Sequence, residues 1–497
     1  MTPANAPFFG EVVVRPQGDQ KEALQDALSK LLATDDPGGF FIRQLNSELA
    51  VPGSDKGLSY DDIEPWLGQR AGLFLTSFEK DEEGASVAQG AGLVATTDPA
   101  ATQRAIDKAE AADPTDDRKR TYKGFAYALD RNGQAAGIVG DFLVVGDEQG
   151  LKKAVDASEG DSLADSAGFK TQLDQAPDDQ FGFLYANPRG LVDALEKVGE
   201  LTAGRVRAAG PQVQALLGQP VAASVSATSD QLALQASVAA SAAASSQESS
   251  LLRDFPEDAW LAFAASDAGQ TYGRVLDQIQ AGTGSGQPLG GLGFDLGGQI
   301  TRWAGDVGGF VGGTSLFGLS GALVLATNDE QASAHTLDQL QRALEGDPAL
   351  SIQPLTEHGE RGFSLTLAAA PIQFQVVQRD GKVVAGLADS VNDVFSPSST
   401  LGDSDAFNSA TDALGEDFAP VTFIDFGPLF QLVDGFPQAQ SDPGYQSAKP
   451  YLDHLDYFVL GARRDQDRAE VRLALGLKDA PSQAGDSGAA SAAVVAK

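Results

Sequence analysis

The side chains that could perform chemistry in this 497-residue chain are its 69 Asp and Glu residues and its three histidines. His335, His358 and His454 stand too far apart for the paired spacing of a helical zinc site such as HExxH. The segment 79–83 (EKDEE) lacks the regular Asp-x-Asp-x-Asp-Gly spacing of a calcium loop. The sequence therefore predicts no metal site and no cofactor, and we expect the histidines and this acidic loop to be solvated.

Nucleophilic and phosphate-binding arrangements are also missing. The chain has no cysteine, which excludes thiol nucleophiles, thiolate metal sites and disulfides. Gly313-Thr314-Ser315 begins like the G-x-S-x-G turn of a serine hydrolase, but Phe317 stands where the second glycine is needed. The glycine-rich string 282–286 (GTGSG) has no lysine and does not match a phosphate-binding loop. We therefore expect no enzymatic activity.

Two similar octets place an Asp-Ser pair ahead of a predicted helix. They are SLADSAGF at 162–169 and TLGDSDAF at 400–407. Asp165 and Asp403 could form a paired active site, but an Asp that precedes a helix more simply caps the free amide groups of its first turn. We expect both to be caps.

The charge balance bears on the choice of partner. The 69 acidic residues outnumber the 35 Lys and Arg residues and give a net charge of −34. Such a surface repels the phosphate backbone of nucleic acids at long range. A hydrophobic content of 42% is ordinary for a globular protein, and no apolar run reaches the 18 residues of a membrane span. We expect a soluble globular protein that does not bind nucleic acid.

A glycine-rich apolar segment at 286–318 is the best candidate for a binding site. Because glycine leaves volume unfilled, this segment could line an apolar cavity or allow a helix to approach the sheet closely. Trp66 and Trp303 occupy equivalent positions in two similar stretches, where each could be a packing anchor or a pocket wall. The candidate residues for an apolar pocket are Trp66, Phe74, Leu289, Leu292, Phe294, Trp303, Phe310 and Phe317.

The elements that would position these residues occur twice. A Trp-Leu-Gly motif, an apolar run and AGLVATT in the stretch 60–97 recur as Trp-Ala-Gly, a glycine-rich run and GALVLATN. Apolar runs arranged as hairpins indicate antiparallel strands. We predict an α+β fold of two tandem copies of one unit, each a meandering antiparallel sheet with helices on one face, joined about a pseudo-twofold axis or as one continuous sheet. The predicted parts are a first unit at 1–242, a linker at 243–254, a second unit at 255–478 and a disordered tail at 479–497.

Three motifs are shared with a known family. They are FGEVVVRPQGDQ at 9–20, YDDIEPWLGQR at 60–70, and SLAD at 162–165 with Phe169. On these motifs the chain resembles an uncharacterised bacterial family, common in actinobacteria, that is known as domain of unknown function 3352. The resemblance implies no established catalytic residues. It also implies export from the cytoplasm, with any membrane attachment made through an anchor absent from this chain.

These observations leave two functions open. The first is a non-catalytic extracytoplasmic binding protein for an apolar ligand, such as a fatty acid or other lipid, with an acidic exterior that keeps the carrier soluble. The alternative is a scaffold or interaction domain that binds another protein in the cell envelope, and a cytoplasmic location is the alternative compartment. Composition cannot separate these functions, because an apolar cavity and a closely packed core use the same residues.

Overall fold

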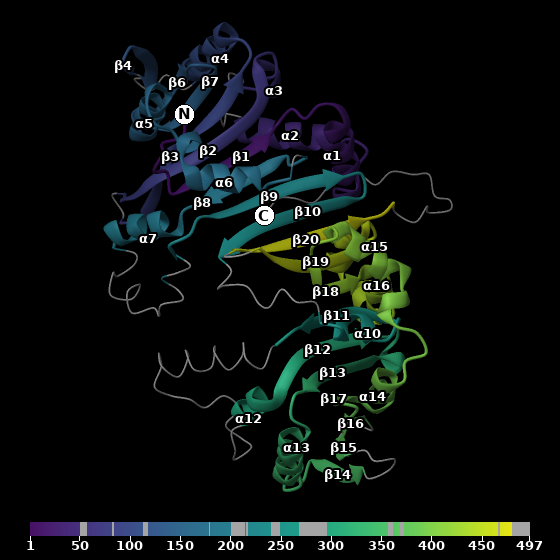
Figure 1. Ribbon diagram of the computed structural model, residues 1–497. Coiled ribbons are helices and arrows are strands. Elements are labelled where there is room, and N and C mark those ends of the chain that lie inside the picture. Colours follow the sequence, from purple (N-terminus) through teal and green to yellow (C-terminus); the bar gives the residue numbers. More distant parts are fainter. Residues whose placement is uncertain are drawn as a thin grey trace, which may run out of the picture.

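The computed structural model of the protein describes residues 1–49, 57–81, 84–112, 118–177, 179–199, 214, 217–239, 249–267, 296–355, 361–367, 372–465 and 468–479. Twenty strands in this part of the chain form one antiparallel sheet with helices packed against it. The α+β class is therefore confirmed, and the two halves share one continuous sheet. Figure 1 shows the strands in a single series from β4 at one end of the molecule to β14 at the other.

The two halves of the sheet follow the same strand order, counted outward from their junction. In the first half the order is β10 (Gln231–Ala239), β9 (Val221–Thr228), β8 (Gly182–Ala186), β1 (Phe8–Val13), β2 (Leu67–Lys80), β3 (Ser86–Thr96), β7 (Phe142–Asp147), β6 (Gln134–Val139), β5 (Phe125–Leu129) and β4 (Arg118–Tyr122). In the second half it is β20 (Arg468–Leu477), β19 (Leu455–Asp465), β18 (Ala419–Asp425), β11 (Ala259–Ala265), β12 (Ala304–Gly312), β13 (Ser320–Thr327), β17 (Lys382–Leu387), β16 (Gln373–Arg379), β15 (Arg361–Leu367) and β14 (Leu350–Leu355).

The seam between the halves is the antiparallel pair of β10 and β20. It runs from the pair Gln231–Gly476 to the pair Ala239–Arg468. Among the described strands, this pair is the one that joins the two halves, so a single ladder of hydrogen bonds makes the sheet continuous.

Helices follow the strands in both halves. Those of the first half are α1 (Gly18–Leu31), α2 (Pro37–Leu49), α3 (Tyr60–Ile63), α4 (Pro99–Ala112), α5 (Glu148–Glu159), α6 (Ala167–Asp174) and α7 (Pro188–Lys197). Those of the second half are α10 (Leu251–Asp254), α12 (Leu296–Trp303), α13 (Glu330–Leu344), α14 (Ala388–Phe395), α15 (Asp405–Leu414), α16 (Phe426–Asp434), α17 (Pro437–Ser441) and α18 (Pro443–Leu452). Short 3₁₀ turns lie at Leu163–Asp165, Leu316–Gly318 and Leu401–Asp403.

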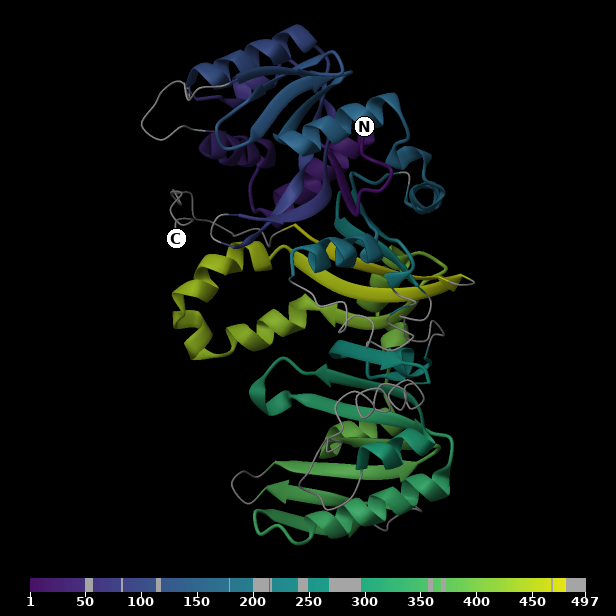
Figure 2. The same cartoon turned by 90° about the vertical axis from the view of Figure 1, so that its left-hand side faces the viewer.

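The helices lie on both faces of the sheet, which corrects the expectation that they cover one face. Val144 of β7 packs in the core with Leu151 and Val155 of α5, whereas its neighbour Leu143 packs with Trp66 and the helix α4. Successive residues of a strand point to opposite faces, so the two helices cover opposite sides. We call the side of Val144 the first face and the side of Leu143 the second face. Figure 2 shows helices on both sides of the strands.

The second half repeats this division at the same place in its sheet. Val384 of β17 joins the core cluster that contains Val391 and Val394 of α14. Its neighbour Val383 packs instead with Trp303 and with Leu337 of α13. The strands carry apolar residues at consecutive positions, and therefore each face needs its own cover. This is why helices on one face alone would not suffice.

Some predicted segments fall partly or wholly outside the described residues. Residues 243–248 of the predicted linker and 480–497 of the predicted tail are not described. The end of the predicted linker is a helix, α10, whose Leu251 and Leu252 are buried in the core of the second half.

Candidate functional site

Trp66 and Trp303 are each buried where a helix meets the second face. Trp66 is 3% exposed and its Nε1 donates a hydrogen bond to the backbone oxygen of Asp62 at 2.8 Å. Trp303 is 2% exposed and its Nε1 donates to Oγ1 of Thr336 at 3.1 Å. Each indole is thus enclosed by its own hydrophobic cluster, and its one polar group is satisfied. This is the environment of a packing anchor.

The other candidates for an apolar pocket are not brought together either. Phe74 and Phe310 are buried in the main cores of the first and second halves, respectively. Phe317 is fully exposed. Leu289, Leu292 and Phe294 lie outside the described residues. The five described candidates therefore occupy four separate clusters and one surface turn, and they do not line a common cavity.

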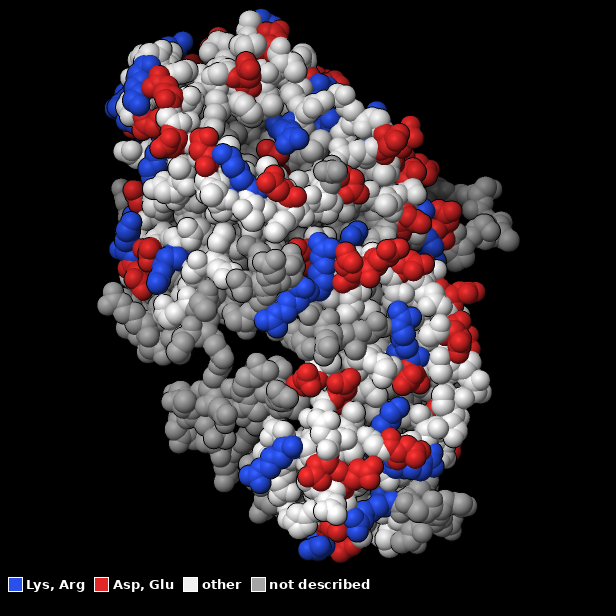
Figure 3. Space-filling view, in the orientation of Figure 1, with Lys and Arg blue, Asp and Glu red and all other residues white. Residues whose placement is uncertain are grey.

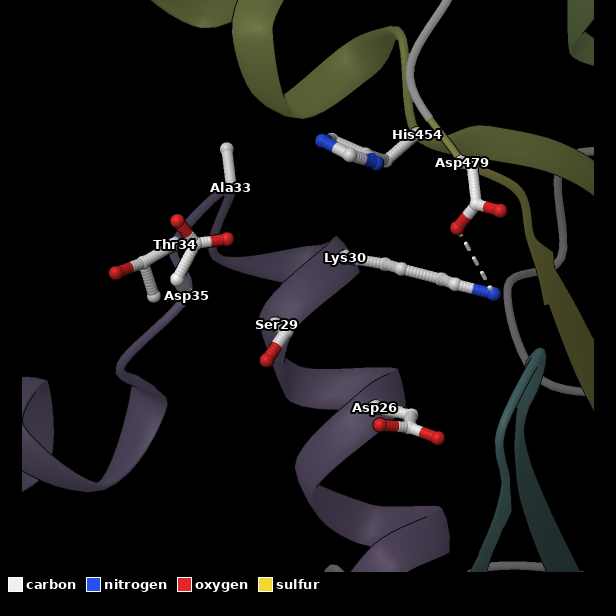
Figure 4. Close-up of a pocket in the computed structure, with 8 residues that line it drawn as sticks. All are labelled: Asp26, Ser29, Lys30, Ala33, Thr34, Asp35, His454 and Asp479. Atoms are coloured by element: carbon white, nitrogen blue, oxygen red, sulfur yellow. Dashed lines mark ion pairs between the residues drawn. The ribbon is translucent and has the colours of Figure 1, made fainter.

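A large hollow in the described surface is polar. It has a volume of about 780 Å³ and lies between α1 and the residues that flank β19 and β20. Figure 4 shows that its side chains lie on different sides of the hollow, with Lys30 reaching toward Asp479 at an Nζ–Oδ1 distance of 3.5 Å. The lining residues are Asp26, Ser29, Lys30, Ala33, Thr34, Asp35, His454 and Asp479. Their arrangement has neither the apolar lining of a lipid site nor a nucleophile beside a base.

A buried polar cluster lies at the seam. Oε2 of Glu470 accepts hydrogen bonds from Nε and Nη2 of Arg463, at 2.9 and 2.7 Å, and from Nε2 of Gln235 at 2.9 Å. Glu470 is only 6% exposed, so its charge needs these partners. Gln235 belongs to the first half and Glu470 to the second. The hydrogen bond from Gln235 to Glu470 therefore crosses the seam and links side chains of the two halves.

No metal site is found in the part of the chain that the structure describes. No group of three or more His, Cys, Asp or Glu side chains there could hold an ion. Asp165 and Asp403 each complete a capping box with Ser162 and Thr400, respectively. The following residues, Ser166 and Ser404, cap α6 and α15, so both Asp-Ser pairs serve the starts of helices.

An apolar strip on the second face is a surface of the described residues that could bind a partner. Its side chains lie on strands of both halves, and each is 39 to 48% exposed. We define the apolar strip as Val12, Leu73, Val145, Leu184, Leu234, Phe263 and Leu323. Isolated exposed apolar residues are normal, but a series that follows adjacent strands marks an interaction surface.

The strand register makes the strip continuous across the seam. Residues that pair across neighbouring strands form an unbroken row from Leu323 of β13 to Val12 of β1. The residues between these two ends are, in order, Gly309, Phe263, Thr422, Leu460, Leu473, Leu234, Val225 and Gly182. A second row joins Val145 to Leu184 through Gly92, Leu73 and Gly10. Except for Thr422, every position in both rows is apolar or glycine. Helix α4 covers this face at one end of the sheet and α12 with α13 at the other.

The strip is a feature that the sequence analysis missed. Alternation within each strand shows that two faces exist, but both sets of positions are rich in Val, Leu and Ala. The available signal was that both sets of alternating positions are rich in apolar residues in strands such as β9, β10, β19 and β20. That signal becomes specific only when the strand order is known.

Acidic side chains are spread over one face of the molecule. Figure 3 shows Asp and Glu over both halves of the visible face, with Lys and Arg interspersed. In the described residues no helix is both long enough and apolar enough to cross a bilayer.

The solved structures that the chain is similar to include two crystal forms of a protein named TP0453. Crystal form III is 9% identical, has a TM-score of 0.24, and covers 49% of this chain and 81% of that chain. Crystal form I is 9% identical, has a TM-score of 0.18, and covers 80% of this chain and 96% of that chain. Likeness at this level carries no argument about function. No curated protein matches the chain.

A comparison with protein families gives a clear result. The family described as "Protein of unknown function (DUF3352)" matches residues 41–475. The match spans both halves of the sheet and includes the signature at Pro65–Arg70, while the motif at 9–20 precedes it. The chain belongs to the DUF3352 family of unknown function.

Proposed function

We propose that the protein is a non-catalytic binding protein that acts outside the cytoplasm and holds a protein partner along the apolar strip. The observation that carries the proposal is the row of half-exposed apolar side chains that crosses the sheet from β7 to β13. Monomeric proteins rarely leave so extended an apolar series in contact with water.

The openness of the strip favours a protein over a single lipid. A small-molecule site usually encloses most of its ligand in a concave pocket. The strip residues instead face solvent, and the predicted pocket residues are distributed among separate cores. A typical interface between two proteins buries about 800 Å² on each partner, so a protein can cover an extended open surface. The lipid-carrier hypothesis remains the competing outcome of the experiment below.

The negative charge of the protein indicates which kind of partner it would bind. A net charge of −34 favours a partner with Lys and Arg around an apolar centre, since opposite charges speed the encounter and suppress wrong partners. An amphipathic helix with an apolar face and a basic face fits both properties.

Sequence features support the location and the absence of catalysis. The chain has no cysteine and no methionine after Met1, so it resists oxidation in an oxidising compartment. The resemblance to an exported family points the same way. The described site residues offer no nucleophile beside a base and no metal cluster.

The test uses two probes on the full chain: a fluorescent amphipathic Leu/Lys helical peptide and a fluorescent fatty acid. Leu234→Asp places a charge at the centre of the strip. Leu173→Asp is the matched control, because Leu173 lies on α6, is 41% exposed and receives the same charge away from the strip. We expect Leu234→Asp to weaken peptide binding about tenfold or more, as burial of a leucine side chain implies.

Three outcomes separate the alternatives. Peptide binding that Leu234→Asp weakens and Leu173→Asp leaves unchanged supports the proposal. Equal peptide affinity in all variants contradicts it, since attraction to the acidic surface alone would explain the binding. Saturable fatty-acid binding that is lost in Leu234→Asp, without specific peptide binding, would favour the lipid carrier.

A further inference from the structure

The hairpin of β12 and β13 ends in an apolar turn that faces solvent. Leu316 is 58% exposed and Phe317 is fully exposed, so Phe317 makes almost no contact with the rest of the protein. We call residues 313–319 (GTSLFGL) the apolar tip. It is separate from the apolar strip, whose residues lie within strands.

The apolar tip is held firmly by its own hydrogen bonds. Oγ of Ser315 accepts a hydrogen bond from the backbone N–H of Gly318 at 3.2 Å, which caps the 3₁₀ turn Leu316–Gly318. Nε1 of the buried Trp260 donates to the backbone oxygen of Gly313 at 2.9 Å. Gly313 has φ +86, and a β-carbon there would collide with the backbone of Gly318. A preformed turn loses little conformational entropy on binding.

The fold itself does not require an apolar turn at this place. In the equivalent hairpin of the first half, the residues between β2 and β3 are DEEGA at 81–85. There Oδ1 of Asp81 accepts a hydrogen bond from the backbone of Ala85 at 2.7 Å. The sequence that connects these two strands thus carries no large apolar residue. The exposed Leu-Phe pair is therefore a specific property of the second half.

Carboxylates lie beside the base of the apolar tip. Asp258 directly precedes Ala259, the strand partner of Gly312. On the other side, Oγ of Ser390 in α14 accepts from the backbone of Gly321 at 2.8 Å, which places the neighbouring Asp389 close to β13. Burial, followed by the charges of Asp258 and Asp389, raises the pKa of Asp393, so these carboxylates share one negative region.

We propose that the apolar tip docks into a second protein, in an apolar pocket rimmed by Lys or Arg side chains. A rigid aromatic anchor surrounded by polar contacts is the usual form of an energetically dominant interface residue. The carboxylates at its base complement a basic rim. They also oppose approach to an anionic membrane, which disfavours lipid insertion.

The experiment begins with photocross-linking in the cells that produce the full chain. The photoreactive residue p-benzoylphenylalanine replaces Phe317, or Asp81 at the equivalent turn as a control. A protein cross-linked from position 317 and not from position 81 is identified, purified and titrated at low and high salt. The titrations use the wild type, Phe317→Ser, and the double variant Asp258→Asn with Asp389→Asn.

The expected result combines an apolar and an electrostatic effect. Phe317→Ser should weaken binding about tenfold to a hundredfold, as the burial of a phenylalanine implies. The double Asn variant and high salt should each weaken it severalfold. Leu234→Asp should leave this affinity unchanged, so a failure of the apolar strip and a failure of the apolar tip can be told apart.

Three results would overturn the proposal. One is the absence of any protein cross-linked specifically from position 317. Another is a cross-linked protein that binds Phe317→Ser as tightly as the wild type, or whose affinity does not respond to salt. A third is binding of the wild type, and not of Phe317→Ser, to phosphatidylcholine vesicles, which would assign the apolar tip to a membrane.

Discussion

The ring of Tyr457 lies over the backbone of Gly476, so that a β-carbon at position 476 would collide with Cε1 of the ring. Gly476 pairs with Gln231 across the seam, and Tyr457 lies on the neighbouring strand β19. Burial, with the charges of Asp230 and Asp456, raises the pKa of Tyr457 to about 12. The neutral ring therefore packs on the seam at the one position that has no side chain to displace it.

Gly476→Ala should destabilise the protein by about 1–3 kcal/mol, because the new methyl group forces the ring or the strand to move. The free energy of unfolding in urea measures the change. In the background of Tyr457→Ala the same substitution should cost much less, since the clash is gone. An equal cost in both backgrounds would show that the Tyr457 ring is not the cause.

The buried carboxylate of the seam cluster should matter more than an exposed ion pair. Glu470→Gln should destabilise the protein by about 1–3 kcal/mol, because the Arg463 guanidinium loses the buried carboxylate that it contacts at 2.7 Å and keeps the exposed carboxylate of Asp417 at 3.4 Å. Glu11→Gln is the control. Its ion pair with Arg70 is short, at 2.6 Å between Oε1 and Nη1, but Arg70 is 60% exposed, so the loss should stay within about 0.5 kcal/mol. Similar urea midpoints for the two variants would contradict the assigned role.

Asp425→Asn should stabilise the protein at neutral pH. Burial raises the pKa of the Asp425 carboxyl in the folded state, although the backbone N–H of Gly427 opposes this by donating a hydrogen bond at 2.9 Å. A raised pKa means that the folded state binds the proton more tightly than the unfolded state, so stability falls as pH rises through the interval between the two values. Asparagine carries no charge, so the variant does not lose stability in this pH interval. Its side-chain oxygen can still cap α16.

The substitution of Asp403 is expected to have the opposite effect on stability. Hydrogen bonds from the backbone and the side chain of Thr400 lower the pKa of this carboxyl in the folded state. Its contribution to stability is present above the unfolded pKa and is lost as pH falls through the folded value. Asp403→Asn should therefore destabilise the protein at neutral pH and have little effect in acid. Thermal melts across a pH series give the difference in Tm between each variant and the wild type. This difference should rise with pH for Asp425→Asn and fall with pH for Asp403→Asn. Differences that change with pH in the same direction for both variants would refute the two assignments.

Trp66→Ala and Trp303→Ala should each destabilise one end of the sheet, by about 3–5 kcal/mol for the loss of a buried indole. Amide hydrogen exchange should increase in α4 and β3 for the first variant, and in α13 and β17 for the second. Binding of the probe peptide should not change, because neither indole reaches the apolar strip. A specific loss of fatty-acid binding in either variant would instead restore the tryptophans as pocket walls.

Local signals in the sequence predicted the elements well. The antiparallel strands expected from the apolar runs of 60–97 are present as the hairpin of β2 and β3, and those of the recurring stretch are present as the hairpin of β12 and β13. The capping residues at the two octets were also predictable, because a cap acts within one turn of its own helix. Such features depend on neighbours in the chain, which a sequence displays directly.

Features that depend on distant partners could not be predicted in this way. Leu143 and Val144 are equally apolar, and only the strand order shows that they face different helices. The expected pocket required the side chains of five residues to lie close together in the fold, and the sequence does not show the distances between them. These residues are Trp66, Phe74, Trp303, Phe310 and Phe317. The apolar strip likewise exists only once twenty strands are in register.

Joining the halves through β10 and β20 also limits how the protein can aggregate. Two separate sheets would expose four edge strands, each a template for pairing with another chain, whereas the continuous sheet formed by the described strands exposes two. The edge strand β4 carries Arg118, Lys119 and Arg120, which repel an incoming copy of themselves. The other edge strand, β14, contains Pro354, which has no N–H to offer a neighbour. Both remaining edges are therefore poor templates for edge-to-edge pairing, and the seam acts as a safeguard of solubility.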